Sequence, residues 1–557
     1  MAWMGFGVES FLLVGFTGAL LHYYKDAHVG YVVYGFVFLS WYAGFLGLVL
    51  LPLDISTALQ GGDANVHSSL VVGWKMVYWL TFILSWMVLP VLIEYSQSGA
   101  FTPEQKLRMS LRYLLRHYAM LLTCGVVLLI YLVVVDHFSI NGIVGVAMTL
   151  ANTYGLLWII ALLGYGLVNI PRRIWTFADP EHHLRETYFR AIQIHDDRVE
   201  ATFVYEDVVR EVRSMLDRFH AIEQSTIILT PEFHHVKHCL GYVVAAVGLN
   251  DEQTVESGMK KGPGMPLRPS KRQLSATFAK DESLPTEGEV IALHGRAKRV
   301  KADLRRCEQA WQEICWTSEQ LSTCAQSRTW RRRALPYSAG LGAAICVVGS
   351  AVIMWSEICM GGSPDLSPVG QILLHASPGF GIQLLLLLVL VYMGTCVYQS
   401  LFSIRGFGRV ALHGAQNSTE LSLLTAAVQQ CRLQFALGYN FFLLLNCRSV
   451  TDRTAFHALF TDMRLIHFFG SGFSLYAPIC MVVFAALTFW QGYARLVKSL
   501  GLEQYEELIP GHLEHEAKIH QGEALVKKGI EKYAKLRARH VKEASETGGG
   551  LTQALLE

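Results

Sequence analysis

Long apolar runs fill both ends of the chain, and one polar stretch, residues 171–333, separates them. Five apolar runs precede this stretch and four follow it. Each run is about 19 to 26 residues long, which is enough to cross ~30 Å of hydrocarbon as a helix with some tilt. Helices are expected because backbone groups in lipid must be hydrogen-bonded within their own segment. The pattern predicts an all-α, polytopic membrane protein with about nine transmembrane helices.

Spans and domains follow from this pattern. The predicted spans, in chain order, are residues 1–24, 29–52, 70–93, 117–135, 145–170, 335–358, 381–402, 421–445 and 473–493. No basic stretch precedes the first run, so we interpret it as an uncleaved span rather than a signal peptide. The predicted domains are an N-terminal five-helix bundle, a polar arm, a C-terminal four-helix bundle and a tail, at residues 1–170, 171–333, 334–493 and 494–557.

Composition supports this class of protein. Apolar residues make up 52% of the 557 residues and charged residues only 17%, whereas soluble domains are nearer a quarter charged. The 11 cysteines are scattered, mostly within apolar runs, so no disulfide framework is expected. Cys359 and Cys447, at predicted external ends of spans, are the candidates for a single disulfide.

The distribution of Lys and Arg predicts the orientation. The link 94–116, the polar arm and the link 403–420 carry basic residues, whereas the links 53–69, 136–144 and 359–380 carry none. The positive-inside rule therefore places the arm in the cytosol, with the N-terminus outside and the C-terminus cytosolic.

One link disagrees with this alternation. Residues 446–472 should be external, yet they include Arg448, Arg453 and Arg464. A short interfacial or re-entrant helix over 455–469 would account for these charges, and the topology of this link stays open.

The polar arm has a helical periodicity of its own. Apolar residues recur every three or four positions from Tyr188 through Phe203 to Phe219, with one slip around Glu206, and from Val300 to Ala325 without a slip. This spacing is typical of two amphipathic, coiled-coil-like helices. Residues 251–289 are rich in Gly, Pro, Ser and Lys and predict a flexible linker. Either the helical hairpin packs on itself, or it docks cytosolic signalling or trafficking proteins. The candidate partner-binding residues are Tyr188, Ile192, Val300, Leu304 and Trp311.

Arg432 is the most conspicuous polar residue within a predicted span, about midway along residues 421–445. A guanidinium at that depth is costly and needs a carboxylate, carbonyls or water. It either makes a structural pair or snorkels to an interface, or it anchors an anionic ligand or a lipid headgroup.

Other polar residues lie within or beside the spans. Amides such as Gln383, Asn440 and Asn169 commonly form interhelical hydrogen bonds. Acidic residues near span ends, such as Glu9 and Glu357, are interpreted as interface residues. The candidate ligand-binding residues are Arg432, Gln383, Asn440, Asn169 and Glu94.

Motifs for chemistry are absent from the sequence. The cluster His234, His235, His238 and Cys239 lacks the spacing of a zinc site and indicates a solvated polar face, so no metal and no cofactor is predicted. We find no Walker A, GxSxG, Rossmann or kinase signature, so no enzyme is predicted. The expected partners are the lipid bilayer and proteins, not nucleic acid.

Several stretches carry a family resemblance. They are LLPLDIS at 50–56, WKMVYWLTFILSWMVLPVLIEYSQSGAF at 74–101, NIPRRIW at 169–175, CRLQFALGYNFFLLL at 431–445, FSLYAP at 473–478 and LGLEQYEEL at 500–508. In this order they resemble the limb-region/lipocalin-interacting membrane receptor (LMBR1-like) family, and within it the branch of LMBR1 domain-containing protein 2. The resemblance implies nine spans, an outside N-terminus and a large cytosolic loop after the fifth span. It also implies a receptor-like or adaptor-like protein, in endocytosis, receptor signalling or small-ligand handling, without an agreed catalytic motif.

Three functions are open at this point. The first is a receptor-like scaffold of the plasma membrane or an endosomal or other endomembrane, with a cytosolic arm that docks partners. The second is a transporter or channel for a small or anionic ligand, with Arg432 and Gln383 along its path, although no broken-helix pair or inverted repeat supports it. The third is a lipid-handling protein such as a scramblase. We favour the first; the ligand, the partners and the oligomeric state are not readable from the sequence.

Overall fold

The structure is a computed structural model. It describes residues 2–26, 29–61, 64–136, 143–177, 179–225, 231–248, 285–326, 330–359, 366–375, 379–403, 412, 416, 418–460, 471–490 and 516–546. The described part consists of helices and connecting segments. It contains no β-strand, apart from an isolated β-bridge between Lys25 and Ser418. Most of the predicted linker, residues 251–284, lies outside the described ranges.

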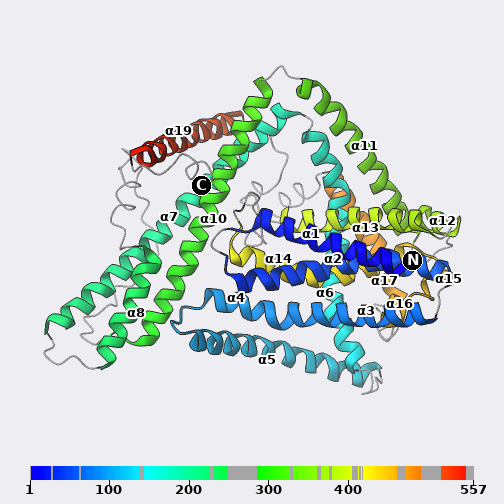
Figure 1. The fold of residues 1–557 in the computed structure, drawn as a ribbon, viewed down its shortest axis with the longest axis horizontal. Helices are drawn as coiled ribbons and strands as arrows, with labels where there is room; N and C mark the ends of the chain where they lie inside the picture. Colours follow the sequence, from blue (N-terminus) through cyan, green and yellow to red (C-terminus); the bar gives the residue numbers. More distant parts are fainter. Residues whose placement is uncertain are drawn as a thin grey trace. The chain divides into compact units, whose positions relative to one another are not determined.

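The helices are drawn in Figure 1. They are α1 (Ala2–Tyr24), α2 (Tyr31–Leu59), α3 (Ala64–Ile83), the π-helix η1 (Leu84–Val88), α4 (Leu89–Gln97), α5 (Pro103–Asp136), α6 (Ile143–Phe177), α7 (Pro180–Ser225), α8 (Pro231–Val247), α10 (Glu287–Gln326), α11 (Trp330–Ile358), α12 (Pro368–His375), α13 (Phe380–Ser403), α14 (Glu420–Leu444), α15 (Arg448–Thr451), α16 (Ala455–Phe460), α17 (Ser471–Phe489) and α19 (Glu516–Glu546).

The chain divides into two compact units, which are described separately. The bundle unit comprises Met1–Ile93, His117–Ile192 and Glu313–Glu557, and the arm unit comprises Glu94–Arg116 and Gln193–Gln312. Helices α4, α5, α7 and α10 each contribute residues to both units. The domain boundaries proposed from the sequence, at residues 170, 333 and 493, stay predictions.

Helices suited to a bilayer are present in the part of the chain that the structure describes. Among the described residues, five helical stretches are long and apolar enough to cross a membrane: Tyr31–Leu59, His67–Gln97, Gly155–Thr176, Tyr337–Ile358 and Phe380–Leu401. Helix α17 adds a shorter apolar stretch, Tyr476–Phe489. The chain is therefore a helical integral membrane protein, and the number of nine spans stays a prediction.

Helix α2 differs from its predicted limits. The predicted span ended at Pro52, whereas the helix continues through this proline to Leu59. A proline removes one backbone donor, and packing against neighbouring helices compensates for that loss in membrane helices. Asp54, expected at the start of a link, consequently lies within the helix and is 1% exposed.

Helix α6 lies at the centre of the bundle unit, in contact with α11, α13, α14 and α17. Glycines permit these close contacts. A Cβ on Gly166 would lie 2.4 Å from the carbonyl oxygen of Cys396 on α13, and one on Gly155 would lie 2.8 Å from the Cβ of Ala436 on α14. In a bilayer, helices associate through such close packing at small residues, because lipid is as apolar as the side chains.

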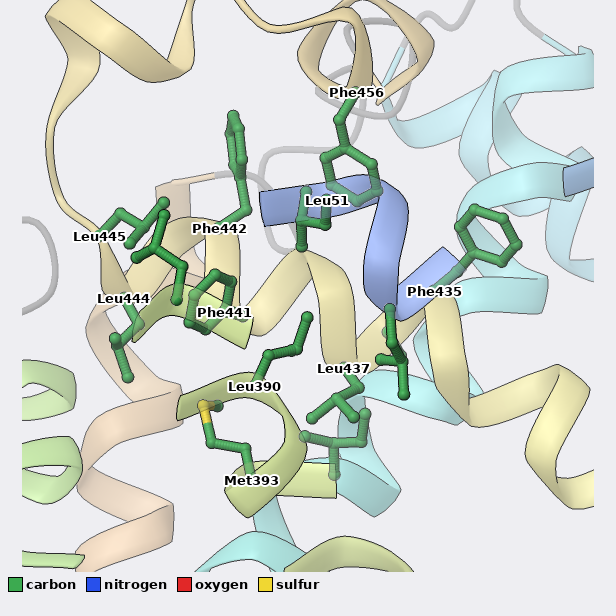
Figure 2. Close-up of a cluster of buried hydrophobic side chains, with 14 of the residues drawn as sticks. Leu51, Leu390, Met393, Phe435, Leu437, Phe441, Phe442, Leu444, Leu445 and Phe456 are labelled. Carbon is green, nitrogen blue, oxygen red and sulfur yellow. The ribbon is translucent and has the colours of Figure 1, made fainter. Parts of the chain in front are cut away.

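Helices α2 and α14 run parallel along one another. Glu420 accepts a hydrogen bond from the backbone N–H of Gly30 at one end, and Gly438 lies close to Leu51 at the other. Figure 2 shows the apolar core at this second end, where the side chains of Leu51 and Phe456 lie beside one another. Because α16 contributes Phe456, the core joins the link after α14 to the membrane helices.

The arm unit has a core of three helices rather than the predicted two. Val212 and Phe219 of α7 pack with Phe233 of α8 and Leu293 of α10, and all four are buried. Helix α8, between the two predicted seams, supplies an apolar face that the hairpin interpretation did not use. Phe203, counted in the predicted seam of α7, is 61% exposed, so it does not pack in the core of the arm unit.

The link between α4 and α5 is attached to α10 within the arm unit. His294 Nδ1 lies 2.6 Å from the carbonyl oxygen of Gly99, and the ring of Phe101 stacks on His294 with centroids 5.0 Å apart. A Cβ on Gly99 would lie 2.0 Å from the carbonyl oxygen of Ile291, so the two backbones touch. Lys298 also donates to the carbonyl of Ser96 at 3.0 Å.

Candidate functional site: polar contacts inside the bundle

Asp54 of the bundle unit is a buried carboxylate with three hydrogen-bond donors. It accepts hydrogen bonds from the indole Nε1 of Trp74 at 3.0 Å, from the backbone N–H of Ala455 at 3.0 Å and from that of Phe456 at 2.8 Å. Donors of this kind compensate the cost of burying a carboxylate. The sequence reasoning did not assign Asp54 a role, and an acidic residue directly after an apolar run was the only signal for it.

These contacts also locate part of the link whose topology was open. Helix α16, Ala455–Phe460, begins at the Asp54 carboxylate and contacts α2 and α3. Its Phe456 ring lies 4.8 Å from that of Trp74, centroid to centroid. A short helix within 455–469 was expected and is found over Ala455–Phe460; residues 461–470 lie outside the described ranges.

Glu357 and Asn440 form a second buried contact. The side-chain amide of Asn440 on α14 donates to Glu357 Oε1 on α11 at 2.5 Å, with exposed fractions of 2% and 1%. Glu357 was expected to be an interface residue, and this expectation is wrong because α14 covers it. Asn440 makes the interhelical hydrogen bond that its residue type suggested.

Arg432 contacts a distorted segment of the third predicted span. Its Nη2 donates to the carbonyl of Ser85 at 3.2 Å, and its guanidinium lies 4.5 Å from the ring centroid of Trp86. Both residues belong to η1, and π-helical turns widen the backbone and often mark functional positions. The Tyr118 hydroxyl of α5 donates to the Trp86 carbonyl. The guanidinium of Arg432 therefore contacts a backbone carbonyl and an aromatic ring.

Glu9 and Gln383 pair α1 with α13. Gln383 Nε2 donates to Glu9 Oε1 at 3.0 Å, and both residues are half-buried. Arg432, Gln383 and Asn440 thus contact three different helical segments, and no contact among them is recorded for the described residues.

The two remaining ligand candidates lie in different units. Asn169 is half-buried in α6 of the bundle unit. Glu94 is half-buried in α4 and belongs to the arm unit. A role of these residues in ligand binding stays a prediction.

The candidate partner-binding residues lie on α7 and α10. Trp311 is 2% exposed, with the His195 ring 5.4 Å from its own and the Arg198 guanidinium 5.1 Å from its centroid. Val300 and Leu304 of α10 are half-buried. Trp311 therefore packs between α7 and α10 within the arm unit.

Tyr188 and Ile192, at the start of α7, are half-buried in the bundle unit. Tyr188 faces α19: it lines a pocket of about 380 Å³ together with residues of that helix, which include Glu516, Ile519 and Glu523. The sequence reasoning did not assign α19 a role, although its apolar positions recur at helical spacing.

Cysteines and histidines are not assembled into a metal site in the described part of the chain. Cys359 and Cys447 are free thiols, so the disulfide considered between them does not form in this structure. The Asn446 side chain instead donates to the Cys359 carbonyl at 3.0 Å. On α8, burial raises the pKa of the Cys239 thiol, which lies 3.8 Å from His235 Nε2.

Comparisons with known proteins agree with the resemblance in the sequence. A family model described as LMBR1-like membrane protein matches residues 3–493. The G-protein coupled receptor-associated protein LMBRD2 of Gallus gallus is 25% identical, over 91% of this chain and 81% of its own length. The LMBR1 domain-containing protein 2 homolog of Drosophila melanogaster is 24% identical, over 86% and 77%. LMBRD2 of Homo sapiens is 24% identical, over 91% and 81%. No solved structure matches.

Proposed function

The chain belongs to the LMBR1-like membrane protein family, and we propose that it is a non-enzymatic scaffold of the membrane that associates with a receptor and docks cytosolic signalling or trafficking proteins. The names of the relatives support the receptor, since several are called G-protein coupled receptor-associated. A cytosolic position of the arm, with the N-terminus outside, is part of this proposal and rests on the distribution of Lys and Arg.

One observation carries the choice of a scaffold over a transporter. The polar side chains that a transport path would need make contacts between helices: Asn440 with Glu357, Gln383 with Glu9, and Arg432 with the η1 backbone. Such hydrogen bonds hold a bundle in one arrangement, whereas a transporter lines a path near the midplane with groups that can bind its substrate.

The arm supplies the docking surface in this proposal. Phe203 and Val204 are adjacent on α7 and are 61% and 43% exposed, in a helix whose Val208 and Val212 are fully buried. Exposed apolar groups outside a bilayer favour contacts with proteins. Val300, Leu304 and Trp311 are proposed to shape this surface, the buried Trp311 by fixing α7 against α10. A partner role is also proposed for Tyr188 and Ile192, separately, because they belong to the bundle unit.

Two parallel experiments test the proposal. Proximity labelling compares the full chain with a Phe203→Ser, Val204→Ser variant, and a Trp316→Ser variant, also at an exposed position, serves as control. We expect cytosolic partners to be lost from the first variant only. The purified full chain in liposomes is expected to conduct no ions and no small anions. Flux that disappears in Arg432→Ala, with labelling unchanged by the arm variant, would contradict the scaffold and favour a transporter.

A further inference from the structure

Helix α19 has one narrow apolar face. Ile519 and Val526 are 6% and 1% exposed, and Gly522 between them is buried, whereas Lys528 and Glu531 are exposed. An amphipathic helix is stable in a folded protein when its apolar face is covered by another element. Figure 1 shows α19 beside the start of α7, and both segments belong to the bundle unit.

The contact between α19 and α7 depends on a glycine. A Cβ on Gly522 would lie 1.9 Å from the carbonyl oxygen of Tyr188 and 2.7 Å from its carbonyl carbon. Backbone atoms cannot move aside as a flexible side chain can, so any larger residue at position 522 would separate the two helices. The backbone of Tyr188 is therefore the centre of a surface that accepts a helix with glycine at the point of contact.

The surroundings of this contact are polar and partly open. Arg185 of α7 pairs with Glu516 of α19 at 3.4 Å, with more than half of each side chain exposed. The adjoining pocket of about 380 Å³ also includes Leu184, Ser322 and Lys527. Exposed ion pairs contribute little to stability, so burial of Ile519 and Val526 is the main attraction. A contact with so few buried apolar side chains is one that a competing helix can replace.

We propose that α19 is an internal cover over a helix-docking surface on α7 centred on Tyr188, and that a partner displaces it with an amphipathic helix of the same pattern. That pattern is a glycine with a branched apolar residue three positions before it and another four positions after it. The inference rests on the proposed scaffold function, because it names where one partner binds and what controls its access. Tyr188 and Ile192, expected from the sequence to bind a partner, then belong to a surface that the chain itself occupies.

The test uses the full chain in lipid nanodiscs and a fluorescent synthetic peptide of residues 516–546 as the probe. In the wild-type chain the tethered α19 fills the surface at an effective concentration on the order of mM, so the free peptide competes poorly. In a Gly522→Leu chain the cover is displaced, and we expect the peptide to bind about tenfold or more tightly than to the wild type. Ala524→Leu, at an exposed position of the same helix, is the matched control and should behave as wild type.

Helix formation by α19 is not the cause of the expected change, because leucine is a better helix former than glycine. A peptide that itself carries Gly522→Leu should not bind the uncovered chain. Hydrogen exchange provides a second measurement: amides of residues 519–530 should exchange faster in the Gly522→Leu chain, while those of α14 stay protected.

Equal peptide binding by the wild-type and Gly522→Leu chains, or binding by the Gly522→Leu peptide, would overturn the proposal. Neither measurement uses a cellular partner, so its failure is separable from that of the scaffold function. If partners are labelled but the peptide test fails, the proposal that α19 is a cover is wrong and the scaffold function stands. A successful peptide test without labelled partners would establish that α19 covers a helix-docking surface, and it would remove the scaffold together with the displacing partner.

Discussion

The side-chain amide of Asn440 on α14 donates to the carboxyl group of Glu357 on α11, and both side chains are buried. Replacing Asn440 by leucine would leave the Glu357 carboxyl without this donor in an apolar core. We expect Asn440→Leu to lower the free energy of unfolding by about 1 to 3 kcal/mol. Thermal unfolding can be followed with a thiol-reactive dye, because Cys396, Cys431 and Cys447 are buried in the folded chain.

Glu357→Gln is the matched control for that experiment, since an amide can keep one hydrogen bond to Asn440 with nearly the same shape. Its unfolding temperature should stay closer to that of the wild type than to that of Asn440→Leu. Equal unfolding temperatures of the wild type and Asn440→Leu would contradict a stabilising role for this pair.

Asp54 should stabilise the helical conformation of α16. Asp54→Ala removes the acceptor for Trp74, Ala455 and Phe456 together. We expect the free energy of unfolding to fall by roughly 3 kcal/mol. Hydrogen bonds to a charged acceptor are worth about 1.5 to 3 kcal/mol each, and water replaces part of what is lost. The hydrogen-exchange rates of amides 455–460 should rise by the factor that corresponds to this loss of free energy. Trp74→Phe, which removes one donor and keeps most of the aromatic packing, should have the smaller effect; a larger one would argue that the ring contacts dominate.

Arg432 and Trp86 should be energetically coupled. The guanidinium lies over the indole and also bonds the Ser85 carbonyl. In a double-mutant cycle with Arg432→Met and Trp86→Leu, we expect a coupling free energy of about 0.5 to 2 kcal/mol, as for partly desolvated cation–π pairs. The same unfolding assay measures it, and additive single effects would show that the two side chains act independently.

The stability of the arm unit should depend on His294. Burial lowers the pKa of this imidazole below its usual value of 6.5, against the raising effect of the Gly99 carbonyl, and Lys298 and Lys106 lower it further. The unfolded chain therefore binds a proton before the folded chain does, so stability is present above about pH 6.5 and falls as the pH drops below it. The protection factors of the α10 amides, which correct for the intrinsic pH dependence of hydrogen exchange, should fall from pH 7.5 to pH 5.5.

His294→Asn supplies the control, because its amide can still donate to Gly99 and does not titrate. This variant should show the weaker dependence on pH. If the two chains lose protection in parallel, another group controls the acid response of the arm.

Gly99 should tolerate no side chain. In Gly99→Ala the new Cβ would lie 2.0 Å from the Ile291 carbonyl oxygen and 2.5 Å from the Gly295 nitrogen. Such overpacking costs typically about 1 to 3 kcal/mol, and exchange of the α10 amides near Gly295 should rise accordingly. Gly288→Ala, where nothing lies within 4 Å of the added Cβ, should be neutral or stabilising.

Local patterns in the sequence determined the class of protein and most helices. Apolar runs of sufficient length predicted α2, α6, α11 and α13, since hydrophobic length and helical hydrogen bonding are properties of one segment. The periodicity of α7 and α10 was likewise visible. Helix α8, which packs with α7 and α10, was not predicted, because an apolar face does not specify which element covers it.

Tertiary structure alone decided where the polar groups go. Glu357 looked like an interface residue and is buried under α14, and Asp54 looked like the start of a link and caps α16 from within α2. Gly522 could not be recognised from its neighbours, because its role is set by the Tyr188 backbone more than 300 residues earlier. These pairings join segments far apart in the chain, and the cost of burying an unpaired polar group selects them only after the helices pack.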